Sequence, residues 1–432
     1  MRNAGRLLLP IGTTNYKKIC DNYYYVDKTL MIKDILDEGT EISLFTRPRR
    51  FGKTLNMDML RTFFEKQEED TSRYFTDKKI WQQGEAYTKH QGKYPVIYLS
   101  LKDANKFTWP DLYARLIETI RDEFFRHSEL NDSPKISNPE FYKKIIAGQA
   151  TEAEYSISIL RLSRMLREHY GQSVILIIDE YDTPIQAGYI NGFYNEAIQF
   201  IRDLFSSALK DNDNLAFGFL TGILRVAKES IFSGLNNIYV YSVLDDKFSD
   251  YFGFTDMEVK QLVHYYALDD KLAEIKEWYD GYRFGEVEIY NPWSVLSYLK
   301  NSCKAIPYWV QTSSNSTINT ILRNLDVETY QKLKDIINGT AISSIVSTNV
   351  IYPELKDKSA NIFGFLLMTG YLKSRRTNFT MRGNILCELC IPNKEIENVY
   401  YNEILSQLAD GVSINTTNVL SEALLQAEIM TN

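Results

Sequence analysis

Cysteine is scarce in this chain, and so are the other signs of a secreted or membrane-spanning protein. The 432 residues include four cysteines, too few for a disulfide framework, which favours a reducing compartment. No apolar run approaches the roughly 18 residues of a membrane-spanning helix. The N-terminus has an apolar core of three leucines, Leu7 to Leu9, which is too short for a signal peptide. We therefore expect a cytoplasmic protein that does not associate with a membrane.

Histidine clusters and an excess of positive charge are missing as well. The four histidines are scattered, so the sequence shows no metal-ligand or catalytic-triad group. The net charge is −7 and the isoelectric point is near 5.4, whereas a protein that binds nucleic acid over its whole surface normally has a basic face. Among the 30 tyrosines, runs such as Tyr23 to Tyr25 could stack on bases, but aromatic residues at this spacing are usually core. The sequence therefore does not identify a macromolecular partner, which could be a protein or a nucleic acid.

The most informative segment that is present runs from Ile42 to Leu55. A β-branched and aromatic run ends in Gly52-Lys53-Thr54, and an amphipathic helix follows, as in the phosphate-loop pattern G-x-x-x-x-G-K-[ST]. Gly52 would let the backbone approach a phosphate, and the helix N-terminus supplies free N–H groups and the positive end of a dipole. We predict that Lys53 reaches the β- and γ-phosphates of a nucleotide and that Thr54 binds Mg²⁺. The alternative is an ordinary loop, because Gly-Lys-Thr also occurs by chance.

One position departs from this pattern. The place of the first glycine is taken by Arg47, and the following Pro48 has no backbone N–H to donate. The loop therefore loses at least one donor, which the charges of the loop arginines could replace. We assign the following residues to ATP binding: Arg47, Arg49, Arg50, Phe51, Gly52, Lys53 and Thr54.

A second segment supplies the acidic partner of such a loop. Five consecutive aliphatic residues, Val174 to Ile178, predict a strand buried on both faces of a parallel sheet. Asp179 and Glu180 follow at its C-terminal end, where open α/β sheets bind their ligands. We predict that Asp179 holds Mg²⁺ and that Glu180 polarises the attacking water as a general base. The alternative is a strand that ends in a solvated acidic turn.

A third segment places polar residues beyond another apolar strand. Leu215 to Leu220 predicts a strand, which ends in Thr221-Gly222. Thr221 could contact the γ-phosphate or orient water, and Arg225 could act as a charge-sensing or finger arginine. Two plainer interpretations stay open, in which Thr221 merely ends the strand and Arg225 pairs with a surface acid.

These segments, together with others along the chain, resemble the bacterial AAA-ATPase-like family. They are Leu9-Pro-Ile-Gly12, Tyr25-Val-Asp-Lys-Thr29, Phe45 to Thr54, Ile178-Asp-Glu-Tyr-Asp182, Thr221 to Arg225, Ser230 to Asn237, Trp278-Tyr-Asp-Gly-Tyr282 and Tyr290-Asn-Pro-Trp293. The resemblance covers most of residues 7–400 and implies nucleotide binding, with the arginine-for-glycine loop as the family's normal form. Longer relatives continue into a nuclease-like domain of the PD-(D/E)xK type, which we expect to be absent here. The Glu-x-Lys triplets at 258–260 and 274–276 are better explained as helix surface.

Apolar strands that alternate with helical segments predict an α/β fold, a P-loop NTPase with a mainly parallel sheet and helices on both faces. The strands are expected at Ile42–Thr46, Val96–Leu101, Val174–Ile178, Leu215–Thr221 and Ile238–Val243, and helices at Trp109–Phe125 and Ala153–His169. We expect an ATPase domain over 1–245, a helical or winged-helix-like lid over 246–380 by family analogy, and a short C-terminal segment over 381–432. A capping box at 255–258 and a cap at 291–292 predict helix starts within the lid.

Two functions are compatible with these residues. The first is a Mg²⁺-dependent ATPase that couples hydrolysis to movement of its lid or of a partner. The second is a nucleotide-gated binding or regulatory module with little or no hydrolysis. Glu180 favours the first, since a pure switch does not need a general base there. No guanine-reading Asn-Lys-x-Asp motif is visible, which favours ATP over GTP. The sequence is compatible with an oligomer and names no partner beyond ATP.

Overall fold

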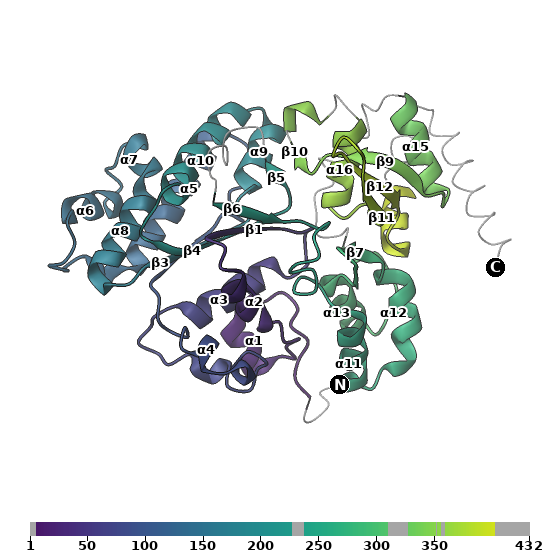
Figure 1. Ribbon diagram of the computed structural model, residues 1–432, viewed down its shortest axis with the longest axis horizontal. Helices are drawn as coiled ribbons and strands as arrows, with labels where there is room; N and C mark the ends of the chain where they lie inside the picture. The colour runs from purple at the N-terminus through teal and green to yellow at the C-terminus, as the bar shows by residue number, and fades with distance from the viewer. Residues whose placement is uncertain (1–5, 227–236, 310–326, 351, 356–358, 402–432) are drawn as a thin grey trace.

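A five-stranded parallel sheet organises the N-terminal half of the protein (Figure 1). The computed structural model describes residues 6–226, 237–309, 327–350, 352–355 and 359–401. Its strand order is β2-β3-β4-β1-β6, and every neighbouring pair is parallel. The strands are β1 (Ile42–Thr46), β2 (Val96–Ser100), β3 (Val174–Asp179), β4 (Leu215–Gly222) and β6 (Ile238–Tyr241). The predicted fold class and all five predicted strands are confirmed.

Helices cover both faces of this sheet, with α1 to α4 on one side and α5 to α10 on the other (Figure 1). Because β1 and β3 are buried along their whole length, both of their faces need apolar cover. The helices are α1 (Tyr16–Asn22), α2 (Leu30–Glu38), α3 (Lys53–Phe64), α4 (Glu85–Thr88), α5 (Trp109–Arg126), α6 (Pro139–Ile146), α7 (Glu152–Ser156), α8 (Ser158–Tyr170), α9 (Thr183–Asn191) and α10 (Tyr194–Leu209). The helix predicted over 153–169 is interrupted at Ile157, whose backbone is not helical, and forms α7 and α8.

A second apolar core lies beyond the sheet. It is built by α11 (Asp256–Tyr266), α12 (Leu272–Tyr279) and α13 (Pro292–Lys300), beside the hairpin of β7 (Tyr282–Phe284) and β8 (Val287–Ile289). Both predicted helix starts are confirmed, because Thr255 and Glu258 form the capping box and Asn291 caps α13. Both Glu-x-Lys triplets lie within α11 and α12, as expected of helix surface rather than a nuclease site.

The C-terminal part contains a three-stranded antiparallel sheet of order β11-β12-β9. Its elements are α15 (Val327–Ile337), β9 (Ile342–Val346), α16 (Ser359–Met368), β11 (Lys373–Phe379) and β12 (Ile385–Cys390). Strand, helix and hairpin follow one another as in a winged-helix unit, so the region is not purely helical. The expected boundary at residue 380 falls in the turn that joins the paired strands β11 and β12, and the expected division into domains stays a prediction.

A helix begins at Lys394, as the sequence indicates. Residues 402–432, most of the predicted C-terminal segment, lie outside the described residues, and so does most of the motif from Ser230 to Asn237. A short parallel pair, β5 (Arg225–Val226) with β10 (Asn349–Val350), joins the end of β4 to the C-terminal unit. The chain that leaves the five-stranded sheet after β4 therefore pairs, in a separate two-stranded sheet, with a strand of the C-terminal half.

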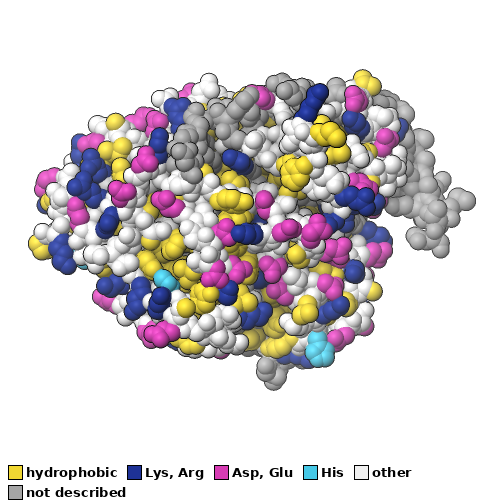
Figure 2. Space-filling view, viewed as in Figure 1, with side chains coloured by type: hydrophobic (Ala, Val, Ile, Leu, Met, Phe, Trp, Pro, Cys, Tyr) yellow, Lys and Arg dark blue, Asp and Glu magenta, His cyan; other side chains and the backbone are white. Residues whose placement is uncertain are grey.

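The surface agrees with the acidic composition. Basic and acidic side chains are interspersed over the face shown in Figure 2, with no large area of one sign. In the part of the chain that the structure describes, no helix combines the length and apolarity needed to cross a bilayer.

Candidate functional site

The loop between β1 and α3 has the backbone of a phosphate-binding turn. Gly52 has φ +84°, a left-handed conformation that glycine adopts readily, and it occupies the N-cap of α3. No side chain among the described residues caps this helix, and its first turn contains no acidic residue. The first-turn N–H groups and the helix dipole are therefore left for an anion. Arg50 also has a positive φ, +70°, which is strained for a residue other than glycine and typical of functional loops.

Lys53 lies at the start of α3 and is folded back onto its own loop. Its ammonium Nζ donates to the carbonyl oxygens of Arg47, at 2.9 Å, and Pro48, at 2.8 Å. Burial lowers the pKa of Lys53, and the charge of Glu180 is the largest influence that raises it. The ammonium has three N–H groups and two of them bond to these carbonyls, so contact with a phosphate uses the third or replaces a carbonyl.

Asp179 lies at the centre of the site, between two threonine hydroxyls. Thr54 Oγ1 donates to one carboxylate oxygen at 2.8 Å, and Thr221 Oγ1 donates to the other at 2.5 Å. Burial raises the pKa of this fully buried carboxyl, while the threonine hydrogen bonds lower it. Thr54 and Asp179 are therefore in contact, as two ligands of one Mg²⁺ would need to be. They do not come from neighbouring strand ends, since β4 separates β1 from β3 and Thr54 reaches Asp179 from α3.

Glu180 follows Asp179 in a left-handed conformation, with φ +56°. Its backbone N–H donates to Thr221 Oγ1 at 3.2 Å, so one hydroxyl joins both acidic residues to the end of β4. The Glu180 side chain is half-buried, and its charge raises the pKa of both Lys53 and Arg50 against the larger, opposite effect of burial. Glu180 thus faces the positively charged loop.

Two residues assigned to ATP binding point their side chains elsewhere. The guanidinium of Arg47 is fully buried and donates to the carbonyl oxygens of Thr46, Tyr241 and Phe248. Its two terminal nitrogens are therefore held by backbone carbonyls inside the fold and do not point at a phosphate beside α3. The ring of Phe51 is also fully buried, against the aromatic rings of β7. The side chains of Arg47 and Phe51 thus pack inside the fold, and the assignment of these two residues to ATP binding stays a prediction.

The remaining arginines lie closer to the surface. Arg49 donates to the side-chain oxygen of Gln186 at 2.9 Å, and the Arg50 guanidinium lies 4.5 Å from the ring centre of Trp293. Arg225 is half-buried at the start of β5, and its Nε has no hydrogen-bond partner among the described residues. No contact joins Arg225 to the carboxylates within those residues, so its catalytic role stays a prediction.

Sequence reasoning missed the residues that fix the turn after β4. The buried carboxylate of Asp182 accepts from the backbone N–H groups of Ile223, at 2.8 Å, and Leu224, at 3.0 Å. The Tyr181 hydroxyl donates to the Leu224 carbonyl, and a Cβ on Gly222 would come within 2.5 Å of the Tyr181 ring. Both residues stand in the quoted motif Ile178 to Asp182, so a signal was present there. Tyr181 and Asp182 hold the turn that follows Thr221 and Gly222 at the end of β4.

The contacts of the phosphate loop with the C-terminal half were also missed. The Trp309 indole N–H donates to the Arg49 carbonyl at 3.2 Å, across 260 residues of sequence. A Cβ on Gly370 would come within 3.0 Å of Pro48, so the chain near residue 370 lies against the loop. No local pattern could predict these contacts, since each partner lies in a different half of the chain.

The oxygen atoms at the site suit Mg²⁺. Hydroxyl and carboxylate oxygens are the ligands that this ion prefers, and Thr54 and Asp179 present one of each side by side. Within the described ranges, no group of three or more His, Cys, Asp or Glu side chains is arranged for a metal. The pair therefore fits an ion that takes most of its ligands from water and phosphate.

The comparisons with known proteins agree with this site. A family model described as Predicted AAA-ATPase matches residues 10–232, just over half of the chain. The protein belongs to this AAA-ATPase-like family. Loop, α3, β3 and β4 all fall within the matched residues.

The individual relatives add little about activity. An uncharacterized protein in the vnfD 5' region of Azotobacter chroococcum mcd 1 is 26% identical over 371 residues, which is 85% of this chain and 64% of that protein. The chain thus spans less than two thirds of that relative. The structure of Drosophila ORC bound to AT-rich DNA and Cdc6 aligns over 90% of this chain and 91% of that chain, at 10% identity. Its TM-score of 0.23 is too low to carry an argument.

Proposed function

We propose that this protein binds Mg·ATP at the loop before α3 and hydrolyses it. The observation that carries the proposal is the hydrogen-bonded group of Thr54, Asp179 and Thr221 beside the N-terminus of α3. Helix N–H groups, a lysine and a hydroxyl–carboxylate pair are the components that phosphoryl transfer needs close together. Their convergence from β3, β4 and α3 supports a nucleotide site over a chance Gly-Lys-Thr loop.

Each residue has a distinct role in this proposal. The N–H groups of α3, with Lys53, bind the phosphates, and Thr54 and Asp179 hold the ion, which neutralises charge on the phosphates. Glu180 accepts the proton of the attacking water. Thr221 positions the two acidic residues, because its hydroxyl donates to the Asp179 carboxylate and accepts from the Glu180 backbone N–H.

We further propose that the nucleotide cycle moves the C-terminal half or a partner attached to it. Binding draws the Lys53 ammonium away from the carbonyl oxygens of Arg47 and Pro48. Pro48 lies against Gly370, and the Arg49 carbonyl accepts from Trp309. A change in the loop conformation therefore alters these contacts with the C-terminal half. The same contacts favour the second candidate, a nucleotide-gated module, in which binding alone changes the loop.

Titration calorimetry with ATP and Mg²⁺ tests the binding step. Lys53→Ala should weaken binding about 10- to 100-fold, the usual effect of losing one charged hydrogen-bond donor. Lys210→Ala, which removes an exposed lysine after α10, is the matched control and should bind as wild type. Wild-type protein that does not bind ATP, or a Lys53→Ala variant that binds equally well, would refute the proposal.

A further inference from the structure

The hairpin of β11 and β12 concentrates positive charge in an acidic protein. Residues 373–384 contain Lys373, Arg375, Arg376 and Arg382 and no acidic residue. All three arginines are exposed, and so is the whole of β11 from residue 375 onward. Glu388 on β12 lies opposite Arg376 and offsets part of this charge. The hairpin therefore carries an excess of positive charge along β11 and at the turn, whereas the whole chain has a net charge of −7.

Large apolar side chains lie beside these arginines. Phe379 is 76% exposed and Met381 is fully exposed, on the two sides of Thr380 at the tip. The turn is ordered by backbone hydrogen bonds, from Thr380 to Asn384 and from Gly383 to Thr380. Exposed apolar side chains at one projecting point, rimmed by charge, are typical of a binding surface.

The hairpin is also braced against the rest of the protein. Arg283, in β7, donates to the backbone carbonyl of Arg375 and holds the base of β11. Charges on an edge strand can serve only to prevent strand pairing between molecules. That explanation covers the arginines but leaves Phe379 and Met381 exposed at the tip without a reason.

We propose that the β11–β12 hairpin binds duplex DNA. A two-stranded ribbon fits a groove of the duplex, and the arginines at 375, 376 and 382 complement the phosphates that line it. Phe379 and Met381 are of the types that proteins insert between base steps in the minor groove. The acidic remainder of the protein repels the duplex elsewhere, so contact is directed to this hairpin.

Fluorescence anisotropy of a labelled duplex, with the full chain and without nucleotide, tests this proposal independently of the ATP site. The triple variant Arg375→Gln, Arg376→Gln, Arg382→Gln should weaken binding and lower the slope of log affinity against log salt by about 3. The matched control carries Arg164→Gln on α8, Arg202→Gln within α10 and Lys210→Gln directly after α10, with the same change in charge. It should keep the wild-type slope.

Two further measurements sharpen the result. Phe379→Ala with Met381→Ala should weaken duplex binding while the salt slope stays unchanged, because no phosphate contact is removed. Thermal unfolding should be unchanged in all variants, since each altered side chain of the hairpin is exposed. The proposal is overturned if wild type does not bind the duplex at low salt, if the control loses as much affinity as the hairpin variant, or if only single strands or acidic peptides bind.

Discussion

Asp179 is the residue at which stability and chemistry conflict most clearly. It is fully buried, and burial raises the pKa of its carboxyl, so the ionised form is disfavoured in the folded state relative to the unfolded one. For a raised carboxyl pKa, the stabilising contribution is present at low pH and is lost as the pH rises through the folded-state pKa. At neutral pH the ionised Asp179 therefore destabilises the protein when no cation is bound.

Asp179→Asn should stabilise the protein by about 0.5–2 kcal/mol at neutral pH without Mg²⁺, because it removes a buried negative charge. This is the usual gain from a substitution that removes a destabilising feature of a functional site. The amide can still bond to the hydroxyls of Thr54 and Thr221. The variant should at the same time lose the Mg²⁺ dependence of ATP binding. Thermal unfolding with and without Mg²⁺ measures both effects, with the exposed Asp213→Asn as control. A less stable Asp179→Asn protein would contradict this reading of the site.

The sequence predicted the positions of residues that depend on local spacing. Gly52, Lys53 and Thr54 had to share one turn, and Asp179 had to end its strand. It could not predict that Arg47 turns inward, because two of the carbonyl groups that accept from its guanidinium belong to residues 241 and 248. A buried side chain is placed by its distant partners, which a motif does not contain.

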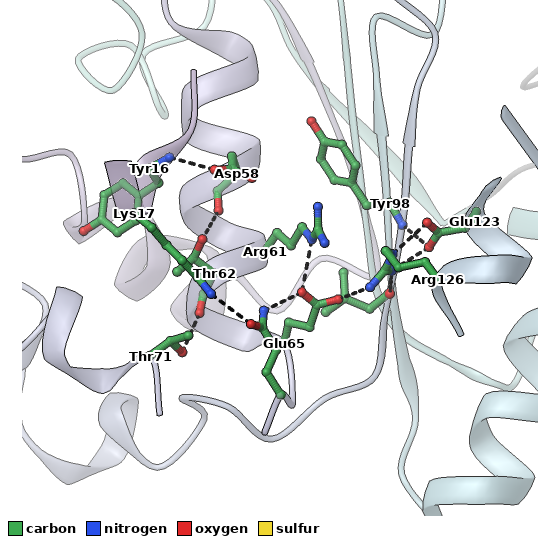
Figure 3. Close-up of polar contacts among 12 residues, drawn as sticks. Tyr16, Lys17, Asp58, Arg61, Thr62, Glu65, Thr71, Tyr98, Glu123 and Arg126 are labelled. Carbon is green, nitrogen blue, oxygen red and sulfur yellow. Dashed lines mark hydrogen bonds and ion pairs between the residues drawn. The ribbon is translucent and has the colours of Figure 1, made fainter. Parts of the chain in front are cut away.

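At the scale of elements, an ion network fastens α3 to α5 and β2 (Figure 3). The Arg126 guanidinium contacts the carboxylates of Glu65 and Glu123, both nearly buried. Burial raises the pKa of Glu123, but the opposing charge and hydrogen bonds of Arg126 outweigh it and bring the pKa to about 2. Glu123 also accepts the backbone N–H of Tyr98 in β2 at 2.7 Å.

Arg126→Met should destabilise the protein by about 3–5 kcal/mol, because it removes the arginine that the buried Glu65 and Glu123 share and leaves Arg61 beside Glu65 and His127 beside Glu123 as the remaining partners. Urea unfolding measures the loss. Arg164→Met removes an arginine of similar size from an exposed pair with Glu168 and should cost less than about 1 kcal/mol. Equal effects of the two substitutions would mean that the network contributes no more than a surface ion pair.

Elements were predictable where their side chains followed a simple pattern. The aliphatic run 174–178 indicated its strand at once, because a central parallel strand needs apolar cover on both faces. The strand β11 was missed, since its sequence, Lys-Ser-Arg-Arg-Thr-Asn-Phe, has little apolar character. It is held by pairing with β12, which pairs on its other side with β9.

At the scale of the whole molecule, Glu395 joins the two parts of the C-terminal half. It is fully buried, accepts from Ser294 Oγ in α13 at 2.8 Å, and accepts from the backbone N–H of Trp309 at 2.8 Å. Trp309 in turn contacts the phosphate loop through Arg49. Burial raises the pKa of Glu395 to about 7. The link to the loop therefore depends on a carboxyl that titrates near neutrality.

The stabilising contribution of protonated Glu395 is present below the unfolded pKa of 4.5 and is lost as the pH rises through about 7. Glu395→Gln is neutral throughout, so its stability relative to wild type should rise by up to about 3 kcal/mol between pH 5 and pH 8. Denaturant unfolding at the two pH values measures this difference. Glu397→Gln, on the same helix but half-exposed, should show no such trend; the same trend in both variants would rule out burial as the cause.

The central claim is that this protein hydrolyses ATP with Glu180 as general base. The rate of ATP hydrolysis by the Glu180→Gln variant tests this claim most directly. The amide is nearly isosteric, and the phosphate contacts come from Gly52, Lys53 and Thr54, so calorimetry should find ATP affinity unchanged. Single-turnover hydrolysis should fall by roughly 10²- to 10⁴-fold, the usual contribution of a positioned general base. Unchanged hydrolysis in the variant would contradict the assignment of Glu180. A wild-type protein that binds ATP but never hydrolyses it, alone or with duplex DNA, would replace the ATPase with the nucleotide-gated module.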